Sequence, residues 1–212
     1  MSVLAILDTT VLVAGLLATH PHHGPSARHL AAAAATPGSY RCTTHALAEA
    51  YRVLVALPLA PRCTPSQALT LIRTSLAPRL APVALTAKDY DRALDVAAES
   101  GLGGGAIYDA LHLMAADRLG AVYLVTANQK HFTCLAQVAR TRVEIIDPSN
   151  VPAAFWEKSG QAPEFQRPPQ VSQSRDMSWM GLAPIPEGTS HDLDDIRTSV
   201  EKRRNQTPGT PP

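Results

Sequence analysis

The sequence has few cysteines, no long apolar run and almost no net charge. Its 212 residues include three cysteines without C-x-x-C spacing, and they are Cys42, Cys63 and Cys134. An odd number of cysteines with this spacing argues against a disulfide framework and a structural zinc site. We therefore expect the three cysteines to be small, buried, hydrophobic side chains. No apolar run approaches the roughly 18 to 20 residues that span a bilayer, and no basic residue precedes the apolar stretch of Met1–Leu17. We therefore expect a cytoplasmic protein without a membrane segment.

A formal net charge of +1 excludes the overall basic field of a general nucleic-acid coat protein. The composition, 45% hydrophobic and 17% charged, is that of a globular chain that can bury a core. After Trp156 the sequence becomes rich in Pro, Ser, Gln and charged residues. We expect 157–212 to be a mostly disordered tail, with one short helix-forming stretch near 190–204 in "SHDLDDIRTSVEKRR".

Short apolar runs alternate with helical patterns in the first 150 residues. We expect strands at Val3–Leu7, Tyr40–Thr44, Val83–Leu85, Val122–Val125 and Val143–Ile146. Helices are expected at Thr44–Leu57, Ala87–Ser100 and Ile107–Leu119, the second with Tyr90, Ala93, Leu94 and Ala97 on its apolar stripe. This order predicts an α/β fold of three layers, α/β/α, with a central parallel sheet. Ligands bind such sheets outside the carboxyl ends of the strands, where Asp8 lies.

Three carboxylates interrupt apolar patterns: Asp8 after the first strand, Glu49 in "THALAEAYRVL" and Asp109 in "GGGAIYDALHLMAADRLG". For any one acid alone, a helix cap or a surface position is the better explanation. If the three converge, like charges about 4 Å apart repel by something on the order of 4 kcal/mol per pair at an effective dielectric near 20. A divalent cation removes that repulsion, and oxygen ligands favour Mg²⁺ or Mn²⁺. We therefore favour a metal site suited to phosphodiester hydrolysis.

The order of "ILDTTVLV", "TTHALAEAYRVL", "GLGGGAIYDALHLMAA" and "LVTANQKHF" resembles the PIN domain, in particular the VapC-like toxins of type II toxin–antitoxin systems. The resemblance covers roughly Met1 to Asp147 and implies a PIN-like nuclease domain at 1–150. It implies an endoribonuclease site in which Asp8, Glu49 and Asp109 bind Mg²⁺ or Mn²⁺. An RNA substrate, a cognate antitoxin that inserts a segment across the acidic cleft, and a homodimer are implied as well.

Two positions depart from the pattern that this resemblance implies. Asn128, in "TANQKHF", occupies a fourth site position where the family has Asp or Asn, and it leaves three anionic ligands, which suits one tightly held ion. Thr10 stands where the family usually has Asn, and its hydroxyl can orient Asp8 or bond to backbone. Thr126 is expected beside the metal. Basic residues near these motifs could contact phosphate by their place in the sequence: Arg41, Arg52, Lys130 and His131.

Other interpretations remain open. A PIN fold that binds RNA or protein with little catalysis fits the Thr10 and Asn128 departures. A haloacid dehalogenase-like phosphatase would use Asp8 as its nucleophile, but no convincing later acidic pair or lysine follows. "GLGGGA" (101–106) fits a dinucleotide fingerprint, which requires a preceding strand, and the Ala87–Ser100 helix stands there instead. "HPHH" (20–23) is better explained as a polar loop than as a soft-metal site.

Overall fold

The computed structural model describes residues 4–59 and 61–150, and these residues contain a four-stranded parallel sheet. The strand order is β2-β1-β3-β4, and every neighbouring pair runs parallel. The strands are β1 (Ala5–Leu7), β2 (Tyr40–Arg41), β3 (Tyr123–Val125) and β4 (Glu144–Ile146). This arrangement confirms the parallel sheet and four of the five predicted strands, although the observed strands are shorter.

The predicted strand Val83–Leu85 is wrong as a strand. Val83 forms one isolated bridge with Thr43, through two backbone hydrogen bonds of 2.9 Å. Pro82 has no backbone N–H to extend the pairing before Val83, and Thr86 already caps the following helix. The segment therefore lies beside the sheet without lengthening it.

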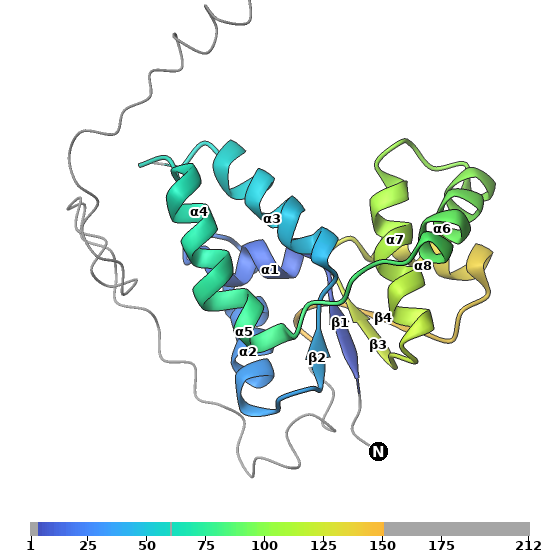
Figure 1. The fold of residues 1–212 in the computed structure, drawn as a ribbon, viewed down its shortest axis with the longest axis horizontal. Helices are drawn as coiled ribbons and strands as arrows, with labels where there is room; N and C mark the ends of the chain where they lie inside the picture. The colour runs from blue at the N-terminus through green and yellow to red at the C-terminus, as the bar shows by residue number, and fades with distance from the viewer. Residues whose placement is uncertain (1–3, 60, 151–212) are drawn as a thin grey trace, which may run out of the picture. The chain divides into compact units, whose positions relative to one another are not determined.

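Helices cover both faces of the sheet, which is the predicted three-layer architecture (Figure 1). One face packs against α1 (Thr9–Leu16), α2 (His23–Ala35), α3 (Thr44–Ala56), α4 (Pro65–Leu71) and α5 (Ala77–Leu80), with a π-helical turn, η1 (Ile72–Leu76), between the last two. The other face packs against α6 (Ala87–Ser100), α7 (Ala106–Arg118) and α8 (Gln129–Ala139). Successive side chains alternate between the two cores, so Ala5 and Leu7 enter the first while Ile6 enters the second.

The helix predicted at Ala87–Ser100 has the predicted bounds, but its buried face is different. Tyr90 and Leu94 are 45% and 59% exposed, whereas Ala93, Val96 and the carboxylate of Asp89 are buried. Asp89 is held inside by its role in the capping box of α6 and by Arg118. The apolar stripe predicted from periodicity is therefore shifted by about one residue position around the helix.

Several smaller expectations have mixed outcomes. Cys42 is buried as predicted, but Cys63 and Cys134 are only half-buried. In the part of the chain that the structure describes, no helix has the length and apolar character needed to cross a membrane. The tail predicted at 157–212, including the stretch near 190–204, lies outside the described residues.

Candidate functional site

Asp8 lies at the carboxyl end of β1 and caps the N-terminus of α1. Its Oδ1 accepts a hydrogen bond from the backbone N–H of Thr9 at 2.6 Å. Its Oδ2 accepts from the hydroxyls of Thr10 and Thr126, at 2.7 and 2.8 Å. Thr10 Oγ1 in turn accepts from the backbone N–H of Ala127 at 3.1 Å. The loop after β3 is thereby tied to the start of α1, and the carboxylate that joins them is only 3% exposed.

Glu49 projects from the middle of α3 toward Asp8's neighbour Thr9. Its Oε2 accepts from Thr9 Oγ1 at 2.8 Å and from His112 Nε2 at 3.3 Å. Burial alone would raise the pKa of Glu49, but the hydrogen bonds from His112 and Thr9 outweigh it and lower this pKa. Glu49 is therefore held as a carboxylate at neutral pH.

His112 lies at the centre of the site and was not among the predicted residues. Its side chain is fully buried on α7, and its Nε2 lies 3.8 Å from Asp8 Oδ1 as well as close to Glu49. Burial lowers the pKa of His112, but the hydrogen bond to Glu49 and the charges of Asp8, Glu49 and Asp109 raise it above its usual value. The sequence did contain a signal for His112. It is the one polar residue in the apolar run "ALHLMAA", and it follows Asp109 by three positions, which places both on the same side of a helix.

Asp109 lies in the first turn of α7 and faces the loop after β3. Its Oδ2 accepts from Asn128 Nδ2 at 3.0 Å and lies 3.4 Å from His131 Nδ1. Burial and then the negative charge of Asp8 raise the pKa of Asp109 to about 6, against the opposing effects of His112 and His131. Asp109 is linked to Asp8 through the loop after β3, because Asn128 donates its side chain to Asp109 and its backbone N–H to Thr126 Oγ1, which donates to Asp8.

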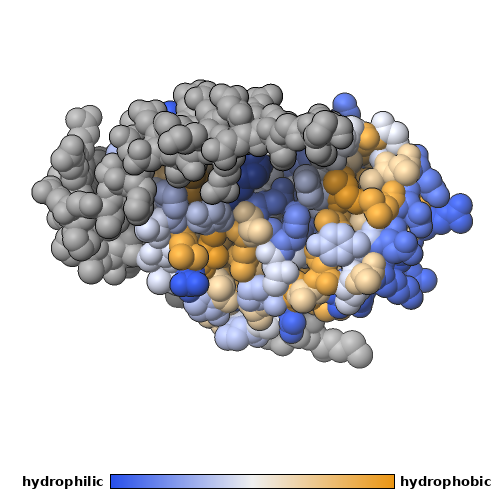
Figure 2. All heavy atoms as spheres, turned by 45° about the horizontal axis from the view of Figure 1, so that its top comes forward, coloured by the Kyte–Doolittle hydropathy of each residue, from blue (hydrophilic) through white to orange (hydrophobic). Residues whose placement is uncertain are grey.

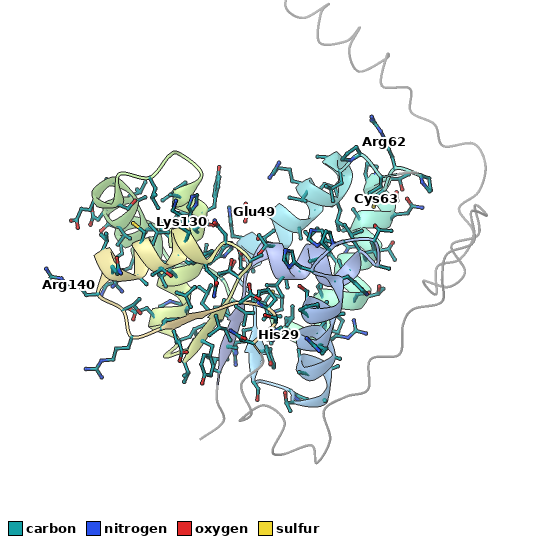
Figure 3. All side chains as sticks on the ribbon, turned by 180° about the vertical axis from the view of Figure 1, so that it is seen from behind. His29, Glu49, Arg62, Cys63, Lys130 and Arg140 are labelled. Carbon is teal, nitrogen blue, oxygen red and sulfur yellow. The ribbon has the colours of Figure 1, made fainter. Side chains whose placement is uncertain are left out.

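In residues 4–59 and 61–150, no lysine or arginine forms an ion pair with Asp8, Glu49 or Asp109. The predicted phosphate contacts Arg41, Arg52 and Lys130 are thus not engaged with the acids, and Lys130 and Glu49 lie at the same end of the sheet (Figure 3). Figure 2 shows this end with hydrophobic residues in separate patches among hydrophilic ones. The described side chains that contact the three acids are histidines, hydroxyl groups and the amide of Asn128, with no lysine or arginine among them.

The carboxylates offer the oxygen donors that suit a divalent cation, and two of them keep one oxygen without a hydrogen bond from the described residues. Across the described ranges, no three His, Cys, Asp or Glu side chains are positioned to hold a metal ion. Asp8 Oδ1 accepts one short hydrogen bond and Oδ2 accepts two from hydroxyl groups, whereas Glu49 Oε1 and Asp109 Oδ1 accept none from any described residue. Two carboxylate oxygens thus remain for a ligand, and a bound cation would relieve the repulsion between the negative charges of Asp8 and Asp109.

Two other sequence features lie outside this site. Gly101 ends α6 in a left-handed conformation and α7 begins at Ala106, so "GLGGGA" is the predicted helix-to-helix turn. In the "HPHH" segment, His22 donates its backbone N–H to His20, and His23 Nδ1 lies 3.0 Å from Ala14 O. His23 is the first residue of α2, and the residues before it form a turn.

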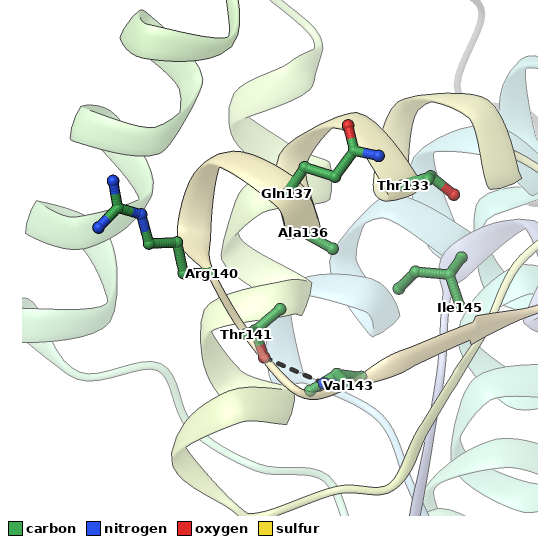
Figure 4. Close-up of a pocket in the computed structure, with 7 residues that line it drawn as sticks. All are labelled: Thr133, Ala136, Gln137, Arg140, Thr141, Val143 and Ile145. Atoms are coloured by element: carbon green, nitrogen blue, oxygen red, sulfur yellow. Dashed lines mark hydrogen bonds between the residues drawn. The ribbon is translucent and has the colours of Figure 1, made fainter.

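The cavity drawn in Figure 4, about 440 Å³ in volume, lies between the end of α8 and β4. Its lining contains no carboxylate and consists of Thr133, Ala136, Gln137, Arg140, Thr141, Val143 and Ile145. None of the predicted site residues contributes to it. The three acids therefore lie outside this cavity.

A parallel sheet covered on both faces, with Asp8 at the carboxyl end of β1, defines a protein of the α/β class. The family model of the PIN domain matches residues 5–139, and the chain belongs to the PIN domain family. It is 34% identical over 110 residues to ribonuclease VapC27 of Mycobacterium tuberculosis, which covers 52% of this chain and 74% of that relative. The predicted VapC-like PIN domain is thereby confirmed.

A solved structure, that of VapC20 of Mycobacterium tuberculosis, described as a sarcin–ricin loop cleaving toxin, is also similar. The match has a TM-score of 0.46 and 18% sequence identity, and it covers 57% of this chain and 86% of that one.

Proposed function

We propose that this chain is a metal-dependent endoribonuclease that hydrolyses RNA phosphodiester bonds, and the toxin of a type II toxin–antitoxin pair. The observation that carries the proposal is the group of three acids, Asp8, Glu49 and Asp109, which three separate elements bring to one end of the sheet without a neutralising lysine or arginine in the described ranges. The 34% identity to a ribonuclease supports the same activity.

In this proposal Asp8, Glu49 and Asp109 hold one Mg²⁺ or Mn²⁺ ion. Such an ion supplies Lewis-acid chemistry, since it polarises a phosphoryl oxygen and lowers the pKa of bound water. The protein's own residues set the positions of the ligands. Thr10 and Thr126 hold Asp8, and Asn128 donates to Asp109. Asn128 therefore supports the site through its amide and adds no negative charge.

The partners are proposed on the basis of the family. They are an RNA substrate, a cognate antitoxin whose segment lies across the acids, and a second copy of the chain. We further propose residues 1–150 as the nuclease domain and the cytoplasm as its location. An adjoining reading frame for a small DNA-binding antitoxin would support the toxin assignment independently of any assay.

A catalytically weak PIN-fold module that binds RNA or protein is the second candidate. It is favoured by the absence of a ready metal-holding arrangement in the described residues and by the hydrogen bonds that already engage Asp8. Membership in the PIN family lends no support to the haloacid dehalogenase interpretation.

The test is RNA cleavage by the full chain, with a structured RNA that contains single-stranded loops. We expect fragments with Mn²⁺ or Mg²⁺, none with EDTA, and none from Asp109→Asn in Mn²⁺. Cleavage that persists in EDTA would contradict metal dependence. Binding of the same RNA without cleavage in Mn²⁺ would favour the second candidate.

A further inference from the structure

The imidazole of His112 has a hydrogen-bonding partner at each ring nitrogen, in surroundings closed to solvent. Nδ1 lies 2.9 Å from Thr43 Oγ1, and Nε2 lies 3.3 Å from Glu49 Oε2 and 3.5 Å from Thr9 Oγ1. Both His112 and Thr43 are 0% exposed. Because water does not reach these atoms, the protein alone decides which nitrogen carries a hydrogen.

Every atom near Nε2 is an acceptor. The carboxylates of Glu49 and Asp8 can only accept when ionised. The hydroxyl of Thr9 gives its hydrogen to Glu49 Oε2 at 2.8 Å, so its oxygen is left to accept as well. A bare lone pair at Nε2 would face these oxygens without a hydrogen between them. Nε2 therefore carries a hydrogen whether the ring is neutral or cationic.

Thr43 complements this arrangement at the opposite nitrogen. As the N-cap of α3, its Oγ1 accepts the backbone N–H of Ala46 at 2.9 Å. Its own hydroxyl hydrogen remains available for Nδ1 of His112. In the neutral ring, Nδ1 is then the acceptor and Nε2 the donor, and the cap of one helix sets the tautomer of a histidine on another.

We propose that Thr43 and His112 are a positioning pair: Thr43 fixes the Nε2–H tautomer of His112, and that N–H orients the carboxylate of Glu49 beside Asp8 for the reaction. Neither Thr43 nor His112 was among the predicted site residues, although both lie within the quoted motifs, and the pair acts through Glu49. Its effect on turnover rests on the proposed ribonuclease function, whereas the tautomer and the orientation of Glu49 do not.

The direct test is NMR of the imidazole nitrogens and of the Glu49 carboxyl carbon, at mildly alkaline pH and without metal. Loss of signals in His112→Gln and Glu49→Gln assigns the two residues. We expect an Nε2-protonated pattern for His112. Thr43→Val should shift the Nδ1 signal to higher frequency, because the lone pair loses its hydrogen bond, and should move the Glu49 carboxyl signal. Thr43→Ser should restore both signals.

Thr64→Val is the matched control, because Thr64 is the exposed N-cap of α4, remote from the acids. It removes a helix cap as Thr43→Val does, and we expect both signals to stay in place. Should Thr43→Val fail to fold, Thr43→Ala removes the same hydroxyl without the second methyl group. A wild-type His112 protonated only at Nδ1, or a Glu49 signal unmoved in both Thr43 variants, would overturn the proposal.

RNA cleavage then measures the consequence for turnover. We expect Thr43→Val to lower kcat about 10-fold or more at an unchanged KM, as losses of outer partners of ligands do, with Thr43→Ser and Thr64→Val near wild type. A wild-type kcat in Thr43→Val despite the moved NMR signals would remove the role in turnover. If the wild type itself does not cleave, the proposed function fails, while the NMR result still decides on the pair.

Discussion

Two carboxylates of this molecule, the buried Asp89 and the half-buried Asp109, have opposite electrostatic environments. Asp89 is 4% exposed, and both its oxygens accept from Arg118 Nε at 3.0 Å. Although burial opposes its charge, the hydrogen bonds from Thr86 and Arg118 lower the pKa of Asp89. Asp109 faces no guanidinium and feels the charge of Asp8, so its pKa is raised to about 6. The more buried of the two acids is the one paired with an arginine, so the absence of a fixed cation, and not burial, separates the candidate functional acid from the structural one.

The same contrast runs along a single helix, α7. Asp109 lies in the first turn, where the helix dipole favours an acid. Asp117 lies in the last turn, where the dipole disfavours one, and it is compensated by Arg92 at 3.1 Å and by the Thr141 hydroxyl at 2.7 Å. The acid in the unfavourable position is thus fully paired, and the acid in the favourable position is left for a ligand.

Exchanging each acid for its amide should separate the two environments most strongly. Asp109→Asn should lower RNA cleavage by more than the roughly 10- to 100-fold typical of outer-shell partners, because a ligand itself is lost. Asp89→Asn should leave cleavage near wild type but lower the free energy of unfolding by about 1–3 kcal/mol, since Arg118 loses its charged partner. Gel assays and urea denaturation measure both. A folded Asp89→Asn variant without RNA cleavage would contradict the distinction between Asp109 as a candidate functional acid and Asp89 as a structural acid.

Adding Mn²⁺ should stabilise only chains in which Asp109 is intact. At a Mn²⁺ concentration of 100 times Kd, binding adds about 2.7 kcal/mol to the free energy of unfolding. We expect this increase, measured as a rise in Tm, in the wild type and in Asp89→Asn, and its loss in Asp109→Asn. An equal rise in all three chains would place the ion elsewhere.

The pH dependence of stability, measured by urea denaturation in EDTA, should have opposite signs for the two acids. The pKa of Asp109 is about 6 in the fold and 3.8 ordinarily, so the unfolded chain releases this proton first. The Asp109 contribution is therefore full below pH 3.8 and is lost as the pH rises through about 6. The lowered pKa of Asp89 gives stability that is present above 3.8 and lost as the pH falls. Asp109→Asn should abolish only the loss of stability as the pH rises through about 6. An unchanged pH profile of the free energy of unfolding in this variant would contradict the raised pKa of Asp109.

Sequence reasoning could predict that Asp8, Glu49 and Asp109 belong together because each interrupts an apolar pattern, and such interruptions can be read directly from the sequence. It missed His112, because the partners of that ring at Thr43 and Glu49 lie 69 and 63 residues away. The burial of Asp89 and its ion pair with Arg118 were not predicted for a related reason. Periodicity located the helix but not the face that α7 covers, and Arg118 lies 29 residues further along the chain. The roles of His112 and Asp89 thus depend on contacts between helices that are far apart in the sequence, and a local pattern does not contain those contacts.

Beside each acid of the comparison lies an exposed tyrosine. Tyr108, next to Asp109, is 46% exposed, and Tyr90, next to Asp89, is 45% exposed. Only Tyr108 has a described ring partner: it stacks on His45 with centroids 5.1 Å apart and planes at 18°. Because one face of the Tyr108 ring is held against His45, we expect the exposed part of the ring to stack on an unpaired RNA base, a contact that contributes about 1–3 kcal/mol.

Replacing these tyrosines should therefore give the smallest of the expected effects. Tyr108→Ala should weaken RNA binding by about 1 kcal/mol, the lower end of the range for one stacked base, with kcat retained. Tyr108→Phe and the matched Tyr90→Ala should bind RNA as the wild type does in fluorescence anisotropy. The two tyrosines are almost equally exposed but have different neighbours. An equal loss of affinity in Tyr108→Ala and Tyr90→Ala would therefore mean that any exposed aromatic ring contributes to RNA binding, and that the position beside Asp109 is not required.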